Sequence, residues 1–431
     1  MKTFLKKIAV IFTILITPLI FLNCEKNEDD INDTIIEIYV KSQATNANIA
    51  NANVILFNAD NGQAVNRSSS DANGKCSFTV TAGGNYYVEI SAQGYLPSPP
   101  KNLTAVPFAA TTGQTTAQTF LLETSTVAGG YVYGYVSPVV NGVLVIAESD
   151  LNGSRYSGIT GPDGYYVIFN VPYASYKMYA YKAGYTATSI PTFKISSGTP
   201  TANKTVNLTT VTGGTLTGKV SFLATTYTGT VDVTILDHST RTPIPGLTDN
   251  LDENANYSIS SIPPGQYMTW ASFQNDGYVM DPDWIYKNPN GLYISYESDS
   301  TKTRNFSVTG AITLNSPTNS ASSLIPVIVT TTTPTFSWTS YPSAKEYIIE
   351  VRDMSGNIVW GGYNTTNGFI NHQQILSSTT SVVYNFDGSA TTALQSGKTY
   401  QWKIYADDDN AAKVQTLISC SEDLRGLFKV Q

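Results

Sequence analysis

Residues 161–185 read GPDGYYVIFNVPYASYKMYAYKAGY, and this stretch decides the fold. Asp163-Gly164 predicts a tight hairpin turn, because glycine readily adopts the positive φ that such a turn requires. A strand follows, Pro172 marks a second turn, and a tyrosine-rich strand pairs back. Gly184 then lets the backbone bend, so that we expect Tyr185 to cap the open end of a β-sandwich.

The same order of signals occurs in two further places. The separation from Gly74 to Tyr95 equals that from Gly164 to Tyr185, while a third copy ends at Tyr278 after a longer final connection. The third copy has Ala255 where the turn glycine stands in the others, so the sequence predicts its first hairpin less clearly. Three copies with matched spacing indicate a tandem repeat of one structural unit.

Strand patterns fill most of the remaining chain. Thr, Val, Tyr, Ser, Asn and Gly dominate the composition, which is typical of strands and turns. Apolar residues recur with a period of two between Asn-Gly, Asp-Gly and Pro-Gly turns, as antiparallel sandwiches require. The clearest such segments are Ile36-Ile38-Val40, Val54-Leu56, Tyr86-Val88-Ile90, Val143-Val145 and Val231-Val233-Ile235.

The repeated unit resembles the carboxypeptidase regulatory-like domain. The second copy carries the match through Val132–Val136, Thr160–Tyr165, Val171-Pro172 and Ala183–Tyr185, whereas the first has Gly83-Gly84 in place of the proline. The resemblance implies seven-stranded sandwiches of the transthyretin-like, carbohydrate-binding-like kind. We assign them to residues 34–124, 129–210 and 213–311.

The last segment, residues 324–431, resembles a fibronectin type III-like sandwich through Pro334–Trp338, Ala344–Asp353 and Leu394–Ile404. The resemblance places Trp338 in the core, and strand alternation places Tyr400, Trp402 and Ile404 on one face. We interpret 123–130, 209–214 and 315–323 as linkers. Because these linkers are short, we expect a semi-rigid rod of four sandwiches.

The chain begins with a segment typical of secretion. Lys2, Lys6 and Lys7 precede an apolar stretch, Ile8–Leu22, that is too short for a comfortable membrane span. Residues 1–23 ending at Cys24 resemble the signal peptide of bacterial lipoproteins, and an acidic tether at 24–33 resembles the export signal of Bacteroidetes lipoproteins. The resemblance implies lipidation of Cys24 and a place on the outer membrane, facing the cell exterior. A plain secretory signal is the alternative.

Charge and cysteine content restrict the partners. Without residues 1–23, 22 basic side chains face 32 acidic ones, a formal net charge of −10. Nucleic acid and anionic lipid need basic patches, so we expect no nucleic acid partner and membrane contact only through the N-terminal lipid. Cys76 and Cys420 lie in different predicted domains, which argues against a disulfide framework. Cys76 alternates with Phe78 and Val80, as a small core residue does.

We find no pattern of residues that predicts catalysis. The two histidines, His238 and His372, lie in turns of different domains, whereas a zinc peptidase needs clustered ligands. No Gly-x-Ser-x-Gly motif of a serine hydrolase occurs, and Ser396–Thr399 fits a hairpin turn better than a phosphate-binding loop. We therefore predict a non-enzymatic protein without cofactor or metal.

Two weaker patterns suggest binding. Asp71, Asn73 and the run 407–410 offer oxygen ligands for calcium, but Asp and Asn also populate turns, which we favour. Aromatic side chains crowd the second and third repeats, and exposed rings can stack on sugars, although tyrosine is also simply a good strand former. The possible glycan contacts are Tyr166, Tyr179, Trp284, Tyr286 and Tyr293.

Together these patterns predict a cell-surface lipoprotein that acts as a modular binding, adhesion or accessory component. Its partner is then a polysaccharide or another envelope protein. The alternative is a structural spacer or assembly partner of another outer-membrane protein, with no ligand of its own.

Overall fold

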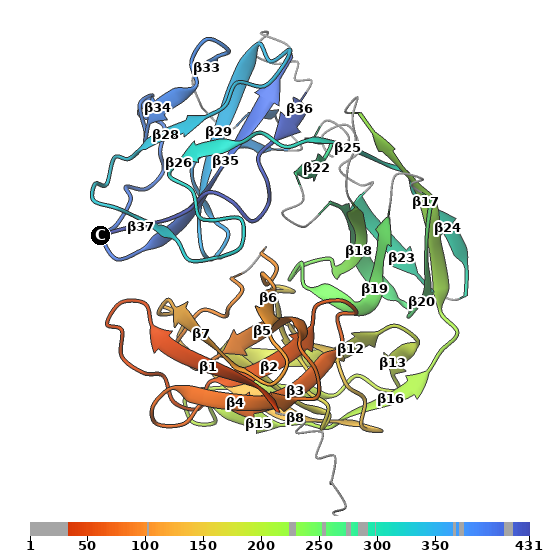
Figure 1. The fold of residues 1–431 in the computed structure, drawn as a ribbon. Helices are drawn as coiled ribbons and strands as arrows, with labels where there is room; N and C mark the ends of the chain where they lie inside the picture. Colours follow the sequence, from red (N-terminus) through yellow and green to blue (C-terminus); the bar gives the residue numbers. More distant parts are fainter. Residues whose placement is uncertain are drawn as a thin grey trace, which may run out of the picture.

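The computed structural model describes residues 33–100, 103–223, 230–251, 256–272, 277–282, 292–297, 299–364, 368–369, 375–408 and 417–431. Every named element in these ranges is a β-strand, and the strands build successive sandwiches (Figure 1). The predicted all-β fold class is confirmed. Within the same ranges, no helix is long and apolar enough to span a bilayer.

The first sandwich packs a sheet ordered β4-β1-β7 against a sheet ordered β3-β2-β5-β6. Alternate residues of β1 point inward, and Ile36 and Ile38 meet Val54 and Leu56 of the facing sheet in one core. Its strands are β1 (Thr34–Ser42), β2 (Asn53–Asn58), β3 (Ala64–Ser69), β4 (Lys75–Val80), β5 (Gly84–Ser91), β6 (Phe108–Ala110) and β7 (Thr115–Leu122).

The second and third sandwiches repeat the pairing of the first. In each unit the opening strand pairs antiparallel with the strand that follows the tight turn, and parallel with strands at the end of the unit. The strands are β8 (Gly129–Ser137), β9 (Leu144–Ser149), β10 (Arg155–Ile159), β11 (Tyr165–Pro172), β12 (Ala174–Lys182), β13 (Tyr185–Ala187), β14 (Thr192–Ile195), β15 (Thr201–Asn203) and β16 (Val206–Thr210), then β17 (Gly214–Phe222), β18 (Val231–Asp237), β19 (Pro243–Leu251), β20 (Asn256–Ile262), β21 (Gly265–Ala271), β22 (Tyr278–Met280), β23 (Tyr293–Tyr296), β24 (Thr301–Thr303) and β25 (Phe306–Gly310).

The turn residues behave as the repeat predicts. Gly74 and Gly164 have φ angles of 71° and 73°, in the left-handed region that glycine tolerates. Tyr95 and Tyr185 are half-buried and pack against the cores of their own sandwiches. Ala255 of the third copy lies outside the described residues.

The last sandwich has two aromatic-rich sheets. Trp338 and Trp402 are buried, and Tyr400, Trp402 and Ile404 alternate with half-exposed residues along β35, as predicted. The strands are β26 (Leu314–Ser316), β27 (Val327–Val329), β28 (Thr335–Trp338), β29 (Glu346–Asp353), β30 (Ile358–Gly361), β31 (Tyr363–Asn364), β32 (Gly368–Phe369), β33 (Ile375–Leu376), β34 (Ser381–Val383), β35 (Thr399–Asp407), β36 (Leu417–Cys420) and β37 (Leu427–Val430).

This sandwich begins before residue 324, where the sequence placed its start. Ile312 and Leu314 belong to its core, β26 pairs with β28, and the Trp402 indole nitrogen donates a hydrogen bond to the Pro317 carbonyl at 2.6 Å. The stretch 315–323 is therefore an edge of the domain, not a linker. Residues 315–323 have the Ser/Thr-rich composition of a linker, because they contact the rest of the last sandwich through their backbone and a few buried side chains.

The first three sandwiches share an apolar core between them. Along β9, Val145 fills the core of its own sandwich, while Leu144 and Ile146 on the opposite face join residues of the neighbouring sandwiches. Ile55 and Phe57 of β2 do the same for the first sandwich. These strands are buried on both faces, so the units are packed against one another and not merely strung together.

The fourth sandwich contacts the first, so the chain closes on itself (Figure 1). The Glu123 carboxylate accepts hydrogen bonds from Lys398 Nζ at 3.0 Å and from the Thr399 backbone nitrogen at 3.2 Å. Beside this contact, Leu103 clusters with Met354 and Leu427 of the last domain. The expected extended rod is wrong for this structure, because short linkers dock neighbouring sandwiches at angles that return the chain to its start.

Candidate functional site

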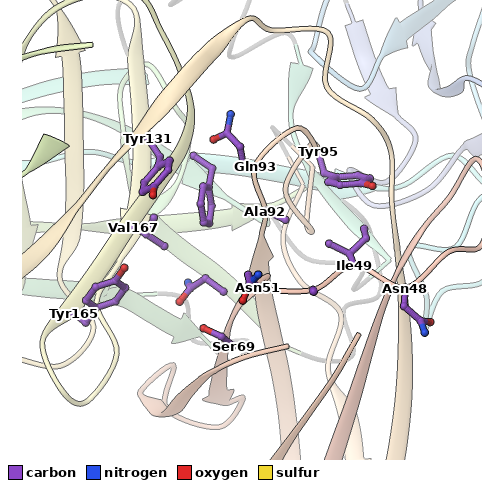
Figure 2. Close-up of a pocket in the computed structure, with 13 residues that line it drawn as sticks. Asn48, Ile49, Asn51, Ser69, Ala92, Gln93, Tyr95, Tyr131, Tyr165 and Val167 are labelled. Atoms are coloured by element: carbon purple, nitrogen blue, oxygen red, sulfur yellow. The ribbon is translucent and has the colours of Figure 1, made fainter. Parts of the chain in front are cut away.

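A groove of 630 Å³ lies between the first and second sandwiches (Figure 2). One side comes from β8 and β11 of the second sandwich and carries aromatic side chains. The other side comes from the segment leading into β2 and its first residue, the end of β3 and the turn after β5, and carries amides, a hydroxyl and the Tyr95 ring. The groove therefore exists only because the two sandwiches are docked.

Five aromatic rings form a row on the outer face of β8 and β11. Strand alternation turns Tyr131, Tyr133 and Tyr135 outward, because the residues between them face the core. Neighbouring ring centroids lie 5.3 to 6.5 Å apart, a spacing typical of tilted and edge-to-face pairs. The order along the row is Phe169, Tyr131, Tyr133, Tyr165 and Tyr135.

Polar side chains face this row across the groove. Asn48 and Asn51 come from the segment before β2, Ser69 from the end of β3, and Gln93 from the turn after β5. In the described part of the chain, the side-chain amides of Asn48 and Asn51 bond to no other residue. An amide offers both donors and an acceptor, so this side can bond to hydroxyl groups of a ligand.

Asn170 of β11 fixes one end of the groove. Its Oδ1 accepts a hydrogen bond from the Gly94 backbone nitrogen at 2.7 Å, and its Nδ2 donates to the Tyr95 carbonyl at 2.7 Å. Asn170 has a φ of 55°, which asparagine tolerates better than most residues, and it lies where the β8–β11 register shifts. This irregularity turns the side chain toward the first sandwich.

An ion pair joins the two sandwiches beside Tyr165 of the aromatic row. Arg67 of β3 lies 2.9 Å from Asp163, and its guanidinium lies 4.3 Å from the centre of the Tyr165 ring. Partial burial opposes the charge of Asp163, but hydrogen bonds from Arg67 and the Tyr165 backbone outweigh it and lower the Asp163 pKa. Tyr165 is thereby held in place by a cation–π contact.

The predicted glycan contacts are not brought together. Tyr166 is wrong as a contact, because its side chain is 0% exposed and its hydroxyl donates to the Lys204 carbonyl at 2.8 Å inside the second sandwich. Tyr179 is half-buried against the shared core and stacks on Tyr181. Tyr293 is 50% exposed on β23, away from the groove, so its role stays a prediction. Trp284, Tyr286 and Cys24 lie outside the described residues.

Of the polar residues considered for metal binding, Asp71 is used by the fold, and residues 409 and 410 lie outside the described residues. The Asp71 carboxylate accepts hydrogen bonds from the backbone nitrogens of Asn73 and Lys75, as a turn residue does. No group of three or more potential metal ligands occurs in the described ranges.

Cys76 is a buried core residue, as predicted, and burial raises its pKa to about 12. His238 is half-buried and burial lowers its pKa, while His372 lies outside the described residues.

Sequence reasoning missed the central residues of the groove, although a signal was present. Tyr131, Tyr133 and Tyr135 occupy alternate positions of one strand, and the residues between them are the ones that match the repeat's core. Three outward tyrosines in a row are unusual for a solvated sheet face, which normally carries polar residues. The amides opposite carry no comparable signal, since Asn is common in any turn.

Residues 35–123 match the carboxypeptidase regulatory-like domain family. The match covers the first sandwich, so the resemblance predicted for this unit is confirmed there. No curated protein matches the chain.

Solved structures that match parts of the chain include proteins from several bacteria. The Bacillus anthracis TIE protein shares 15% identity over 64% of this chain, with a TM-score of 0.18, and the chain spans 50% of its length. BcpA, the major pilin subunit of Bacillus cereus, shares 13% identity over 65% of this chain and 100% of its own, with a TM-score of 0.19. A DUF3823 family protein from Bacteroides uniformis shares 12% identity over 56% of this chain and 88% of its own, with a TM-score of 0.19.

Proposed function

We propose that this chain is a non-enzymatic surface lipoprotein that binds carbohydrate in the groove between its first two sandwiches. The observation that supports the proposal is that an aromatic row faces, across one groove, side-chain amides that bond to no other described residue. Lipid on Cys24 would hold the protein on the outer membrane, and the last sandwich, which resembles a fibronectin type III-like domain, would be presented with it.

The two sides of the groove suit the two surfaces of a sugar. The C–H face of a pyranose ring is apolar and stacks on aromatic rings such as Tyr131 and Phe169. Its hydroxyl groups each donate and accept hydrogen bonds, as do the side-chain amides of Asn48 and Asn51. A sugar in this groove can therefore stack on the aromatic side and form hydrogen bonds with the amide side.

The proposal is tested by carbohydrate binding to the full chain, purified in detergent, on a glycan array followed by calorimetry. Tyr131→Ala removes a stacking surface and is expected to weaken binding about three- to tenfold. Tyr173→Ala is the matched control, because Tyr173 is 47% exposed in the second sandwich but does not line the groove. Binding that is equally strong in both variants would place the ligand elsewhere.

The alternative function, an assembly partner of another envelope protein, is favoured by a different surface. Ile325, Val327 and Ile328 are 58%, 39% and 54% exposed at and before β27 of the last sandwich. Exposed apolar residues along a strand can contact another protein. Absence of any glycan binding, together with crosslinks from this strand to one envelope protein, would support this function over the first.

A further inference from the structure

We propose that the groove binds an extended, uncharged polysaccharide along its length and that Tyr135 adds a contact beyond the groove itself. This inference rests on the proposed carbohydrate binding and specifies the class of carbohydrate. It depends on three features of the site, which are the length of the aromatic row, the lack of charge in the groove and the position of Tyr135.

The aromatic row is longer than the groove. Phe169, Tyr131 and Tyr165 line the groove, Tyr133 lies between Tyr131 and Tyr165 in the row, and the row continues past Tyr165 to Tyr135. Tyr135 is 51% exposed, so its ring is accessible to a ligand that extends out of the groove. A single sugar or a short chain end would leave this part of the row unused, whereas a polymer would cover it.

The rings of the row have two different roles. One face of Tyr165 is occupied by the Arg67 guanidinium, and the Tyr135 ring meets Tyr165 at an interplanar angle of 71°. Tyr165 is therefore a positioning residue that supports its neighbours. The rings left to stack on a ligand are Phe169 of β11 and Tyr131, Tyr133 and Tyr135 of β8.

The groove carries no charge that an acidic polymer could use. None of the described residues that line it is Lys, Arg, His, Asp or Glu. The nearest ion pair, between Arg67 and Asp163, is satisfied within the protein at 2.9 Å. An anionic sugar would lose hydration without gaining a cation, and the negative net charge of the chain adds repulsion. The groove therefore favours neutral sugars, whose hydroxyls match the amides opposite.

The experiment uses the full chain in detergent, with affinity electrophoresis in gels that contain xylan, mannan, galactan or starch. Alginate and polygalacturonate serve as the charged polymers. We expect at least one neutral polymer to retard the protein and both charged polymers to leave it unaffected. Calorimetry then compares that neutral polymer with its own disaccharide.

Tyr135→Ala is expected to weaken binding of the polymer three- to tenfold and to leave binding of the disaccharide unchanged. Tyr131→Ala weakens binding of both ligands, Tyr131→Phe retains it, and Tyr173→Ala changes neither. Equal effects of Tyr135→Ala on polymer and disaccharide, or equal retardation by alginate, would overturn this inference while leaving carbohydrate binding intact. If no polymer or disaccharide binds at all, the proposed function itself fails.

Discussion

Glu89 is an acidic side chain on the face of β5 that points toward the neighbouring sandwiches. It lies opposite Ile55 in the β2–β5 register, and Ile55 belongs to the core that the first three sandwiches share. Burial raises the Glu89 pKa from 4.5 to about 7, because the charged form loses hydration there. The folded protein therefore holds this proton more tightly than the unfolded chain does.

A raised carboxyl pKa makes folding less favourable as pH increases. Between pH 4.5 and about 7 the folded state binds more protons than the unfolded state, so the free energy of unfolding falls as pH rises through this interval. We expect Glu89→Gln to increase the free energy of unfolding at pH 8 by at most about 3 kcal/mol, and so to raise the melting temperature. At pH 4.5 the substitution should have little effect on either quantity. Thermal melts of wild type and variant at both pH values measure this difference.

Glu37→Gln is the matched control for this prediction. Glu37 lies on β1, and hydrogen bonds from Lys75 and Tyr39 lower its pKa. Removing its charge should not stabilise the protein at pH 8. A gain from Glu89→Gln that is the same at both pH values would contradict the assignment of burial as its cause.

At the scale of elements, the strands with two buried faces decide how the sandwiches dock. Alternation from Val143 into β9 predicts one buried face, that of Val143 and Val145, and leaves Leu144 and Ile146 to point outward. In the structure both outward residues are 0% exposed, because neighbouring sandwiches cover them. An uninterrupted apolar run was the available signal, since strands buried on both faces lose the alternation of a solvated sheet.

Ile146→Ala tests this second buried face. We expect the variant to lose about 2 to 4 kcal/mol of unfolding free energy, because a buried aliphatic side chain is replaced by a cavity. Leu151→Ala, at a position that is 82% exposed in the same sandwich, should change stability by less than about 0.5 kcal/mol. Urea denaturation of the two variants and wild type gives the comparison. An equally small effect of both substitutions would mean that the sandwiches are not packed through this face.

At the scale of the whole molecule, the contact between the first and last sandwiches closes the chain. Glu123 is 12% exposed in its side chain and bonds to both Lys398 and the start of β35. Lys429 Nζ donates to the Gln43 carbonyl at 2.9 Å beside it. These contacts join residues that are far apart in sequence, and they combine polar bonds with the apolar cluster around Leu427.

Charge reversal at Glu123 is expected to open this closed arrangement. Glu123→Lys places two cations together at Lys398, so we expect a larger radius of gyration in small-angle scattering than for wild type. Lys177→Glu is the control, because it reverses a charge in an exposed ion pair with Asp150 inside the second sandwich and should leave the radius unchanged. An elongated wild-type particle would contradict the closed arrangement and support the extended rod that the sequence predicts.

The sequence by itself determined the local features of this protein. Turn glycines with positive φ, alternating strands and the buried aromatic residues of the last sandwich follow from short-range backbone preferences and from the need to bury apolar side chains. Only the tertiary structure decided which outward faces are covered, where the last domain starts and how the groove forms. Asn51 and Tyr131 belong to different sandwiches, and they line one groove because contacts of Asn170 and Arg67 dock the two sandwiches. Such contacts depend on how complete domains fit together, which no local pattern encodes.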